Sequence, residues 1–214
     1  MASNFNSAAR SGGGRASYLS NLSVSFQEFF RQPMLVGSAF PASQHLVDAL
    51  LDPVDWTKAR VVVEYGPGSG PLTRAILTRM PRDSHLLAIE ISPHFTRHLR
   101  SSIHDPRLLA VTGSAASVDA ILKEKGLGSA DVIVTGIPFS TMSAGDADTI
   151  LDASAHILGS EGHMLAYQMR PAIAPMLTQR FADVEHTRVW RNIPPCHLYW
   201  AHGPARKPAA RKIL

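Results

Sequence analysis

One stretch of the chain, from Val61 to Thr73, constrains the fold more than any other. It reads Val-Val-Val-Glu-Tyr-Gly-Pro-Gly-Ser-Gly-Pro-Leu-Thr. Three consecutive β-branched residues predict a strand that is buried on both faces, as in a parallel sheet. The glycines suit a loop that needs left-handed backbone or close approach to a ligand, and Pro71 suits the first position of a helix. The stretch therefore predicts a strand, a glycine loop and a helix whose N-terminal N–H groups face a polar ligand.

The residues around this loop narrow the kind of ligand. A phosphate-binding P-loop ends in Gly-Lys-Ser/Thr, but here Gly70 is followed by Pro71 and Leu72. The dinucleotide-binding fingerprint needs its third glycine where Pro71 stands. Glu64 would repel a phosphate, whereas it suits a cationic or hydroxyl-rich ligand. A tight strand–helix turn without a ligand is the alternative.

The sequence Glu-x-Gly-x-Gly-x-Gly, from Glu64 to Gly70, resembles motif I of the class I S-adenosyl-L-methionine (SAM) methyltransferases. The resemblance implies that the acid lies near the cationic methionine end of SAM and that the glycines pass under the cofactor. The cofactor-binding residues that it implies in this stretch are Glu64, Tyr65, Gly66, Pro67, Gly68 and Gly70.

A second acid follows about 20 residues after the loop, at the end of the predicted strand His85–Ile91. At this position Glu90 is expected to accept hydrogen bonds from both hydroxyls of a ribose. The alternative is a solvated charge at a strand end. Further cofactor contacts are expected at Ile91, Ser114 and Ala115. Many methyltransferases have an acid where Ser114 stands, and its hydroxyl would accept more weakly from the adenine amino group.

Apolar patterns along the chain alternate between strand and helix periods, which predicts an α/β fold. The resemblance implies a Rossmann-like, seven-stranded methyltransferase sheet, mostly parallel, with an antiparallel C-terminal hairpin and helices on both faces. After the second strand, we expect a helix that buries Phe95 and Leu99, strands Arg107–Thr112, Asp131–Thr135, His163–Gln168, Val184–Trp190 and His197–Ala201, and helices Ala144–Leu158, with Gly159 just past its end, and Pro171–Phe181.

Four segments follow from this pattern. Residues 1–15 are expected to be disordered, 16–58 to form a helical segment, 59–203 to form the SAM-binding domain and 204–214 to be a basic tail. A helix from about Ala16 to Arg31 would carry one apolar face, and Ser43 would cap the next helix. The first helix is interpreted either as a lid over the cofactor or as an interfacial membrane helix. Tyr18 on it is a candidate substrate contact. The tail is either a solubilising extension or a membrane contact.

The loop after the fourth strand is the predicted catalytic region. Ligands of α/β sheets lie beyond the carboxyl ends of the strands, and the loop here reads Gly136-Ile137-Pro138-Phe139-Ser140. The carbonyls of Gly136 and Ile137 are expected to orient the lone pair of a substrate amine. Apolar surface from Ile137 to Phe139 would lower the pKa of that amine by desolvation. The sequence identifies no general base.

A closer resemblance rests on three parts of the chain: residues 29–43, residues 62–68 together with 87–90, and the loop 136–140 followed by Trp190-Arg191-Asn192-Ile193-Pro194-Pro195. Together they resemble bacterial phospholipid N-methyltransferases, over roughly residues 26–203. The resemblance implies SAM-dependent methylation of phosphatidylethanolamine, towards phosphatidylcholine, by a peripheral protein on the cytoplasmic face of the membrane. Methyl transfer would be an in-line displacement by a neutral amine.

Composition agrees with this expectation without deciding it. The net charge of +4 and the pI of about 9.5 favour an anionic partner, and charge alone does not separate a membrane from a nucleic acid. The chain has one cysteine, Cys196, which excludes an internal disulfide and fits a reducing cytosol. His94 and His98 are spaced for one helix face but have no evident third ligand, so no metal site is expected.

Three further functions are compatible with the sequence. An RNA adenine N-methyltransferase would share the cofactor and the positive charge, but such enzymes usually carry Asn or Asp where Gly136 stands, to hold the base amino group. Glycine has no side chain to do this, so a nucleic-acid substrate is less favoured. A lipid-binding protein without turnover and an enzyme for a small soluble amine also fit the residues. The oligomeric state is left open.

Overall fold

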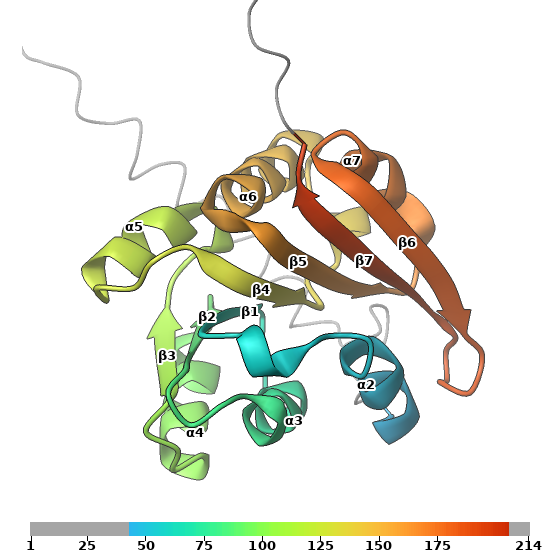
Figure 1. Cartoon of the computed structure of the whole chain (residues 1–214). Helices are drawn as coiled ribbons and strands as arrows, with labels where there is room; N and C mark the ends of the chain where they lie inside the picture. Colours follow the sequence, from blue (N-terminus) through green and yellow to red (C-terminus); the bar gives the residue numbers. More distant parts are fainter. Residues whose placement is uncertain (1–42, 206–214) are drawn as a thin grey trace, which may run out of the picture.

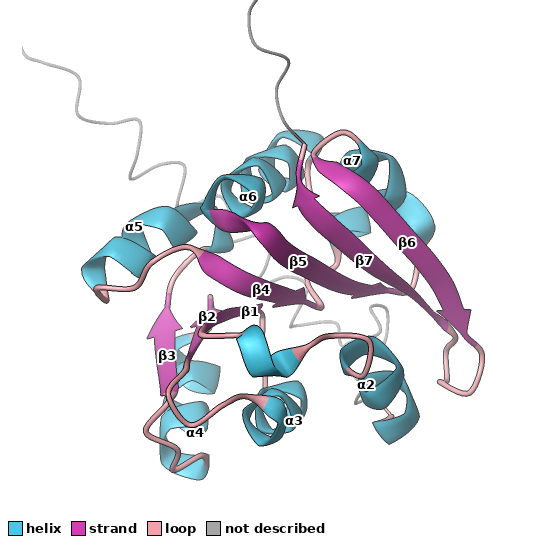
Figure 2. Ribbon diagram, in the orientation of Figure 1, coloured by secondary structure: helices cyan, strands magenta, loops and turns pink. Residues whose placement is uncertain are grey.

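A computed structural model of the chain describes residues 43–205. They form one seven-stranded sheet with helices on both faces, shown along the sequence in Figure 1 and by element type in Figure 2. The strands are β1 (Val61–Tyr65), β2 (His85–Glu90), β3 (Leu108–Thr112), β4 (Ala130–Thr135), β5 (Leu158–Gln168), β6 (Phe181–Val189) and β7 (Cys196–Pro204). The α-helices are α2 (Gln44–Leu51), α3 (Pro71–Arg79), α4 (Pro93–Ser102), α5 (Val118–Glu124), α6 (Ala144–Ile157) and α7 (Ala174–Thr178), and short 3-10 turns are η2 (Trp56–Lys58), η3 (Ala115–Ser117), η4 (Phe139–Thr141) and η5 (Pro171–Ile173).

The strand order confirms the predicted fold class. The order is β3-β2-β1-β4-β5-β7-β6, in which the first five strands run parallel and β7 is antiparallel to both β5 and β6. The chain reverses its direction of travel across the sheet between β1 and β4. At such a switch point two neighbouring loops leave in opposite directions, and a crevice opens between them. The glycine loop after β1 lies at this point.

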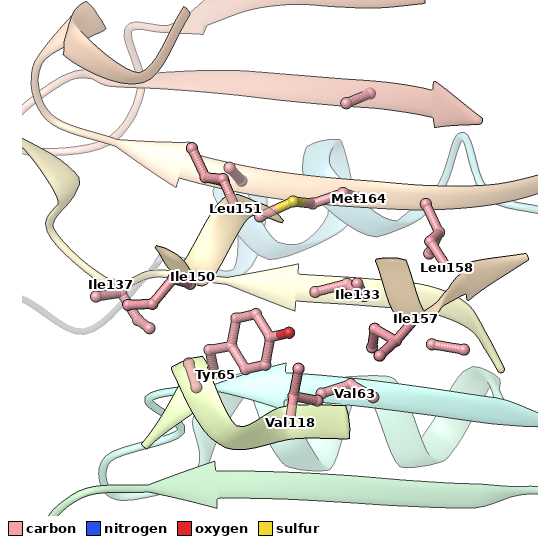
Figure 3. Close-up of a cluster of buried hydrophobic side chains, with 14 of the residues drawn as sticks. Val63, Tyr65, Val118, Ile133, Ile137, Ile150, Leu151, Ile157, Leu158 and Met164 are labelled. Carbon is pink, nitrogen blue, oxygen red and sulfur yellow. The ribbon is translucent and has the colours of Figure 1, made fainter. Parts of the chain in front are cut away.

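Two hydrophobic layers hold the helices to the sheet. On one face, the helices α5, α6 and α7 cover residues such as Val63, Tyr65 and Met164, whose side chains Figure 3 shows packed between helix and strand. On the other face, α2, α3 and α4 cover Val62 and Leu165. Consecutive residues of β1 therefore point into opposite cores, which explains its unbroken β-branched sequence.

Helix α2 belongs to the second of these cores. The Ser43 hydroxyl caps it by accepting from the Leu46 N–H at 3.2 Å, as its sequence predicts. Its apolar residues are buried, and the indole N–H of Trp200 on β7 donates to the Leu50 carbonyl at 2.9 Å. Residues 43–58 of the predicted helical segment thus pack on the sheet, whereas the proposed helix at 16–31, Tyr18 and most of the tail lie outside the described residues.

Three predicted boundaries were wrong. Strand β5 begins at Leu158, directly after α6, because Leu158 is already extended and pairs with Ala130. Gly159 therefore lies within a strand and has no left-handed φ, so it does not end the helix in the expected way. The predicted helix at 171–181 is a 3-10 turn followed by the short α7, since Phe181 already pairs with Pro204 in the sheet.

In α4, Thr96 rather than Phe95 is buried beside Leu99. Thr96 faces the sheet, where its hydroxyl accepts from the Thr112 hydroxyl of β3 at 2.9 Å, and the adjacent Phe95 is half-buried. The two histidines of the helix, His94 and His98, are exposed. Within residues 43–205 no group of histidine, cysteine and acidic side chains is arranged to hold a metal ion. Over the same range, no helix combines the length and the apolar character needed to cross a bilayer.

Replacing Trp200 by Phe tests the attachment of α2. The change removes the hydrogen bond to the Leu50 carbonyl and leaves a small void, so the free energy of unfolding should fall by about 2 kcal/mol. Urea denaturation monitored by circular dichroism measures it. Trp190→Phe is the matched control, since Trp190 is 67% exposed and its loss should change stability by less than about 0.5 kcal/mol. Equal midpoints for the two variants would contradict the role given to the Trp200 indole.

Candidate functional site

The glycine loop between β1 and α3 has the left-handed backbone that its sequence predicts. Gly66, Gly68 and Gly70 have φ angles of 68°, 57° and 88°. A β-carbon on Gly70 would lie 2.7 Å from a methyl carbon of Leu99, so both the conformation and the packing require glycine there. Pro71 then starts α3. The loop is therefore compact, and its backbone rather than its side chains is presented to the crevice.

The Glu90 carboxylate ties this loop to the neighbouring one. One of its oxygens accepts from the Gly68 N–H at 3.1 Å and the other accepts from the Ser92 N–H at 2.9 Å. Glu90 is 1% exposed, so it is not a solvated charge at a strand end. Burial raises the pKa of its carboxyl, while these backbone hydrogen bonds act in the opposite direction. Each oxygen retains lone-pair capacity for one more donor, as the predicted pairing with two ribose hydroxyls requires.

Glu64, at the base of the loop, is a second buried carboxyl. It is 1% exposed, and its described hydrogen-bond partner is the Thr73 hydroxyl, which donates to it at 2.7 Å. Burial is the main cause that raises the pKa of Glu64 to about 8; the Thr73 hydrogen bond opposes the shift and the charge of Glu90 adds to it. The carboxyl therefore retains its proton at neutral pH until a cation approaches. A positive ligand beside the loop would reverse this balance.

A cleft opens where the loops after β1, β2, β3 and β4 meet. The residues that line it come from all four of these loops and from α6. Apolar side chains form the walls and the Glu90 carboxylate lies at one side, so the cleft suits a flat, hydroxyl-bearing group such as a nucleoside. Its lining residues are Gly66, Ile89, Glu90, Ile91, Gly113, Ser114, Ala115, Ile137, Met142 and Ile150.

Six of the predicted site residues line this cleft, namely Gly66, Glu90, Ile91, Ser114, Ala115 and Ile137. Sequence reasoning missed the other four lining residues. Ile89 was placed correctly in β2, but only the structure shows it facing the cleft. Met142 and Ile150 come from the end of η4 and from α6, whose position over the crevice no local pattern indicates.

The remaining predicted cofactor residues support the loop without lining the cleft. Tyr65 is fully buried in the core, where its hydroxyl lies 3.1 Å from the Ser154 hydroxyl; Figure 3 shows its ring among core side chains. Pro67 is buried and accepts from the Gly70 N–H. Ser114 lines the cleft, but its hydroxyl oxygen already accepts from the Ala116 N–H at 3.2 Å, which further weakens it as an acceptor for an adenine amino group.

The loop after β4 differs in detail from its predicted role. The Ile137 carbonyl accepts from the Gln168 side-chain amide at 2.8 Å and from the Phe139 N–H at 2.9 Å. Both of its lone pairs are thus occupied, which leaves the Gly136 carbonyl as the backbone acceptor for a substrate amine. Phe139 is 4% exposed and packs in the core, so its ring anchors the loop to the core instead of facing the cleft. Pro138 directly precedes η4.

Tyr167, near the end of β5, lies against the predicted catalytic loop, a position that sequence reasoning missed. Its hydroxyl and ring edge occupy the space that a side chain at Gly136 would need. Tyr167 as a whole is half-buried. Burial of its hydroxyl is the main cause that raises the pKa of this group, the nearby Glu64 adds to the shift, and the hydroxyl stays protonated at neutral pH. In the sequence it is one aromatic residue within a strand pattern. Only the pairing of β4 with β5 brings it to the loop after β4.

Comparisons with known proteins agree with this geometry. No protein-family model matches the chain. The chain is 29% identical over 179 residues to an ornithine lipid N-methyltransferase of Singulisphaera acidiphila, which covers 82% of this chain and 93% of that protein. It is also 30% identical over 107 residues to ribosomal RNA small subunit methyltransferase A of Bordetella pertussis, covering 50% of this chain and 38% of that protein.

Solved structures show the same fold. The N-methyltransferase NodS of Bradyrhizobium japonicum, in complex with S-adenosyl-L-homocysteine, aligns with a TM-score of 0.65 at 14% identity, over 84% of this chain and 98% of that one. The precorrin-6y C5,15-methyltransferase of Geobacter metallireducens aligns with a TM-score of 0.61 at 17% identity, over 77% and 91% of the two chains. The described chain therefore has the fold of SAM-dependent methyltransferases, and the comparisons support the expected cofactor and the N-methyltransferase class.

Replacing Glu90 by Gln tests the ribose contact. Gln is nearly isosteric and keeps one oxygen acceptor for the loop, but it loses the charge that would strengthen hydrogen bonds from two hydroxyls. The dissociation constant for SAM, measured by calorimetry, should rise about tenfold or more. The control is Glu124→Gln, because the Glu124 side chain is exposed on α5. Unchanged affinity in the Glu90 variant would remove this carboxylate from the cofactor site.

Glu64 generates a pH prediction. The folded pKa of Glu64, about 8, lies above its ordinary value of 4.5, so ionisation of Glu64 opposes folding. The free energy of unfolding therefore falls as the pH rises from about 4.5 to about 8. Glu64→Gln should therefore raise the free energy of unfolding by about 2 kcal/mol at pH 8. A bound cation favours the carboxylate, so the affinity of the unmodified protein for SAM should increase as the pH rises from about 6 to 8.

The control ligand is S-adenosylhomocysteine, whose thioether carries no sulfonium charge. Its affinity should depend much less on pH over the same range, and Glu64→Gln should abolish the difference between the two ligands. Parallel pH profiles for both ligands in the unmodified protein would show that Glu64 does not face the sulfonium.

Proposed function

We propose that this chain transfers a methyl group from SAM to the primary amine of a membrane lipid, with phosphatidylethanolamine and ornithine lipid as the two head groups to distinguish. The sequence likeness to an ornithine lipid N-methyltransferase spans most of both chains and supports a lipid substrate. The ethanolamine head group was the expectation from the sequence. Both lipids present a primary amine, so the shared chemistry is N-methylation of an aminolipid.

The residues present fit the cofactor. The left-handed glycine loop leaves room for close backbone approach, Glu90 faces the cleft with free acceptor capacity, and the apolar walls suit an adenine ring. Glu64, buried without a described cation partner, would hold the positive end. SAM supplies an electrophilic methyl group on its sulfonium when it is bound. The protein's task is then to hold a neutral amine in line with that methyl group.

The amine end of the site is built by Gly136 and its neighbours. The Gly136 carbonyl and the Tyr167 hydroxyl oxygen can each accept an N–H of the amine and so direct its lone pair. Ile137 supplies apolar surface, which lowers the pKa of an ammonium group and favours its neutral form. Glu90 is the one titratable side chain among the described cleft-lining residues, and its remaining acceptor capacity is assigned to the ribose hydroxyls of the cofactor. Proton loss therefore goes to solvent.

The observation that carries the choice of substrate is the filled space beside Gly136. Adenine N-methyltransferases usually carry an Asn or Asp side chain there, which holds the base amino group. Here Tyr167 occupies that volume, so the position is closed to such a side chain as well as lacking one. The likeness to ribosomal RNA methyltransferases covers half of this chain, and we interpret it as a shared cofactor half.

We further propose that the protein works peripherally, at the cytoplasmic face of a membrane. The net charge of +4 favours an anionic surface. Membrane contact by the proposed helix at 16–31 and by the basic tail at 204–214 stays a prediction. The whole of that helix and residues 206–214 of the tail lie outside the described residues.

Radiolabelled methyl transfer by the full chain tests this function. Four acceptors are compared: vesicles with phosphatidylethanolamine, vesicles with ornithine lipid, vesicles of phosphatidylcholine and phosphatidylglycerol only, and total RNA. We expect label in at least one aminolipid and none in the other two acceptors. Gly136→Asn should lose this activity, because the new side chain collides with Tyr167. Label in RNA alone would replace the proposal with adenine methylation, and cofactor binding without any transfer would support a non-enzymatic protein.

A further inference from the structure

The large hydrophobic side chains that remain exposed gather at one edge of the described structure. Within residues 43–205 they are Met169, Trp190 and Ile193, at 43%, 67% and 81% exposure. Met169 directly follows β5, and the other two lie in the loop that joins β6 to β7. Because Gln168 pairs with His197, that loop lies beside the end of β5. This is the same edge of the sheet at which the cleft opens, and Figure 1 shows the β6–β7 loop projecting from it.

The loop is held in a fixed shape. Asn192 is 6% exposed, and its side-chain oxygen accepts from the Ser43 N–H at 3.1 Å. Its amide group donates to the Pro194 carbonyl at 2.8 Å. The next residue, Ile193, is the most exposed of the three hydrophobic residues. The buried Asn192 side chain thus fixes the loop in a conformation that exposes Ile193 and Trp190, which form its apolar tip.

Arginines lie in the same segments as the exposed hydrophobic residues. The Arg188 guanidinium lies 3.9 Å from the ring centroid of Trp190, and Arg170 and Arg191 are exposed. The sequence carries no acidic residue from 162 to 182 or from 186 to 204. A Trp flanked by arginines suits the boundary between lipid head groups and hydrocarbon. Ile193, which cannot stack on a base, favours hydrocarbon over a nucleic acid.

We propose that the β6–β7 loop docks this protein on an anionic lipid surface: Trp190 and Ile193 enter the interface, and Arg170, Arg188 and Arg191 face the lipid phosphates. This inference deepens the proposed function, on which it rests for its biological meaning, because it turns the mouth of the cleft towards the lipid head groups. It assigns membrane contact to described residues of the sheet edge, independently of any N-terminal helix.

Intrinsic fluorescence of the full chain gives a direct test. The chain has three tryptophans, and Trp56 and Trp200 are 8% and 9% exposed, so a change on adding vesicles reports Trp190. With vesicles containing phosphatidylglycerol, its emission should shift to shorter wavelength and be quenched by lipids brominated on their acyl chains. Trp190→Phe should lose both signals. Absence of both signals in the unmodified chain would overturn the proposal.

Two variants test the apolar and the charged contributions. Ile193→Asp should abolish the fluorescence shift, and Arg191→Glu should weaken partition into anionic vesicles about tenfold or more. The matched control is Arg82→Glu, which makes the same change of net charge in the exposed turn before β2, at the opposite edge of the sheet. If Arg82→Glu weakens partition as much as Arg191→Glu, the attraction is one of overall charge and the loop has no special part in it.

Acrylamide quenching without vesicles tests whether something else covers the loop. Trp190 should be quenched freely; protection in the free protein would mean that another part of the chain or a second copy covers the loop, and would overturn the proposal. Quenching of Trp190 by RNA without a response to vesicles would do the same.

Methyl transfer separates this inference from the proposed function. Ile193→Asp should lower transfer to vesicle lipid but leave transfer to detergent-dispersed lipid unchanged. Methyl transfer without any Trp190 response would contradict the docking proposal and leave the proposed enzymatic function standing. A Trp190 response without methyl transfer would contradict the enzymatic function and leave the docking proposal standing.

Discussion

The arrangement of the site depends on one buried interaction, in which the Glu90 carboxylate accepts hydrogen bonds from the backbone N–H groups of Gly68 and Ser92. It joins the loop after β1 to the loop after β2 where both leave the sheet. A buried carboxylate without such donors would be strongly disfavoured, so the two loops and the acid define one another's positions. Gly66 and Glu90, which belong to the two connected segments, both line the cleft.

The buried carboxyl of Glu64 lowers the stability of the folded protein. The carboxyl has given up water for a single described hydrogen bond from Thr73, and burial shifts its pKa upward. This is unfavourable for folding and useful only if a cation binds nearby. Its position at the end of the strand that leads into the glycine loop is the reason for proposing it as a cofactor contact. The hydrophobic layers on both faces of the sheet provide the stability that tolerates it.

The proposed substrate end of the site depends on residues of the neighbouring strand β5. Tyr167 fills the space beside Gly136, and Gln168 occupies the Ile137 carbonyl, so two consecutive residues of β5 determine what the loop after β4 can hold. The β6–β7 loop continues this edge outward with an apolar tip among arginines. A small amine carried on a lipid fits all three features, because it needs a narrow acceptor site that opens towards a membrane surface.

The sequence by itself determined the local elements: the buried strand of β1, the left-handed glycines, the Ser43 cap and the acid at the end of β2. These depend on residues close together in the chain, where conformational preference and period are sufficient. The seven-stranded, mostly parallel sheet was implied by family resemblance. Tertiary structure alone decided that Tyr65 faces the core, that β5 begins at Leu158, that Tyr167 closes Gly136 and that the Ile137 carbonyl is occupied. Each of these depends on contacts between residues far apart in sequence, which strand pairing and helix packing bring together and which no local pattern encodes.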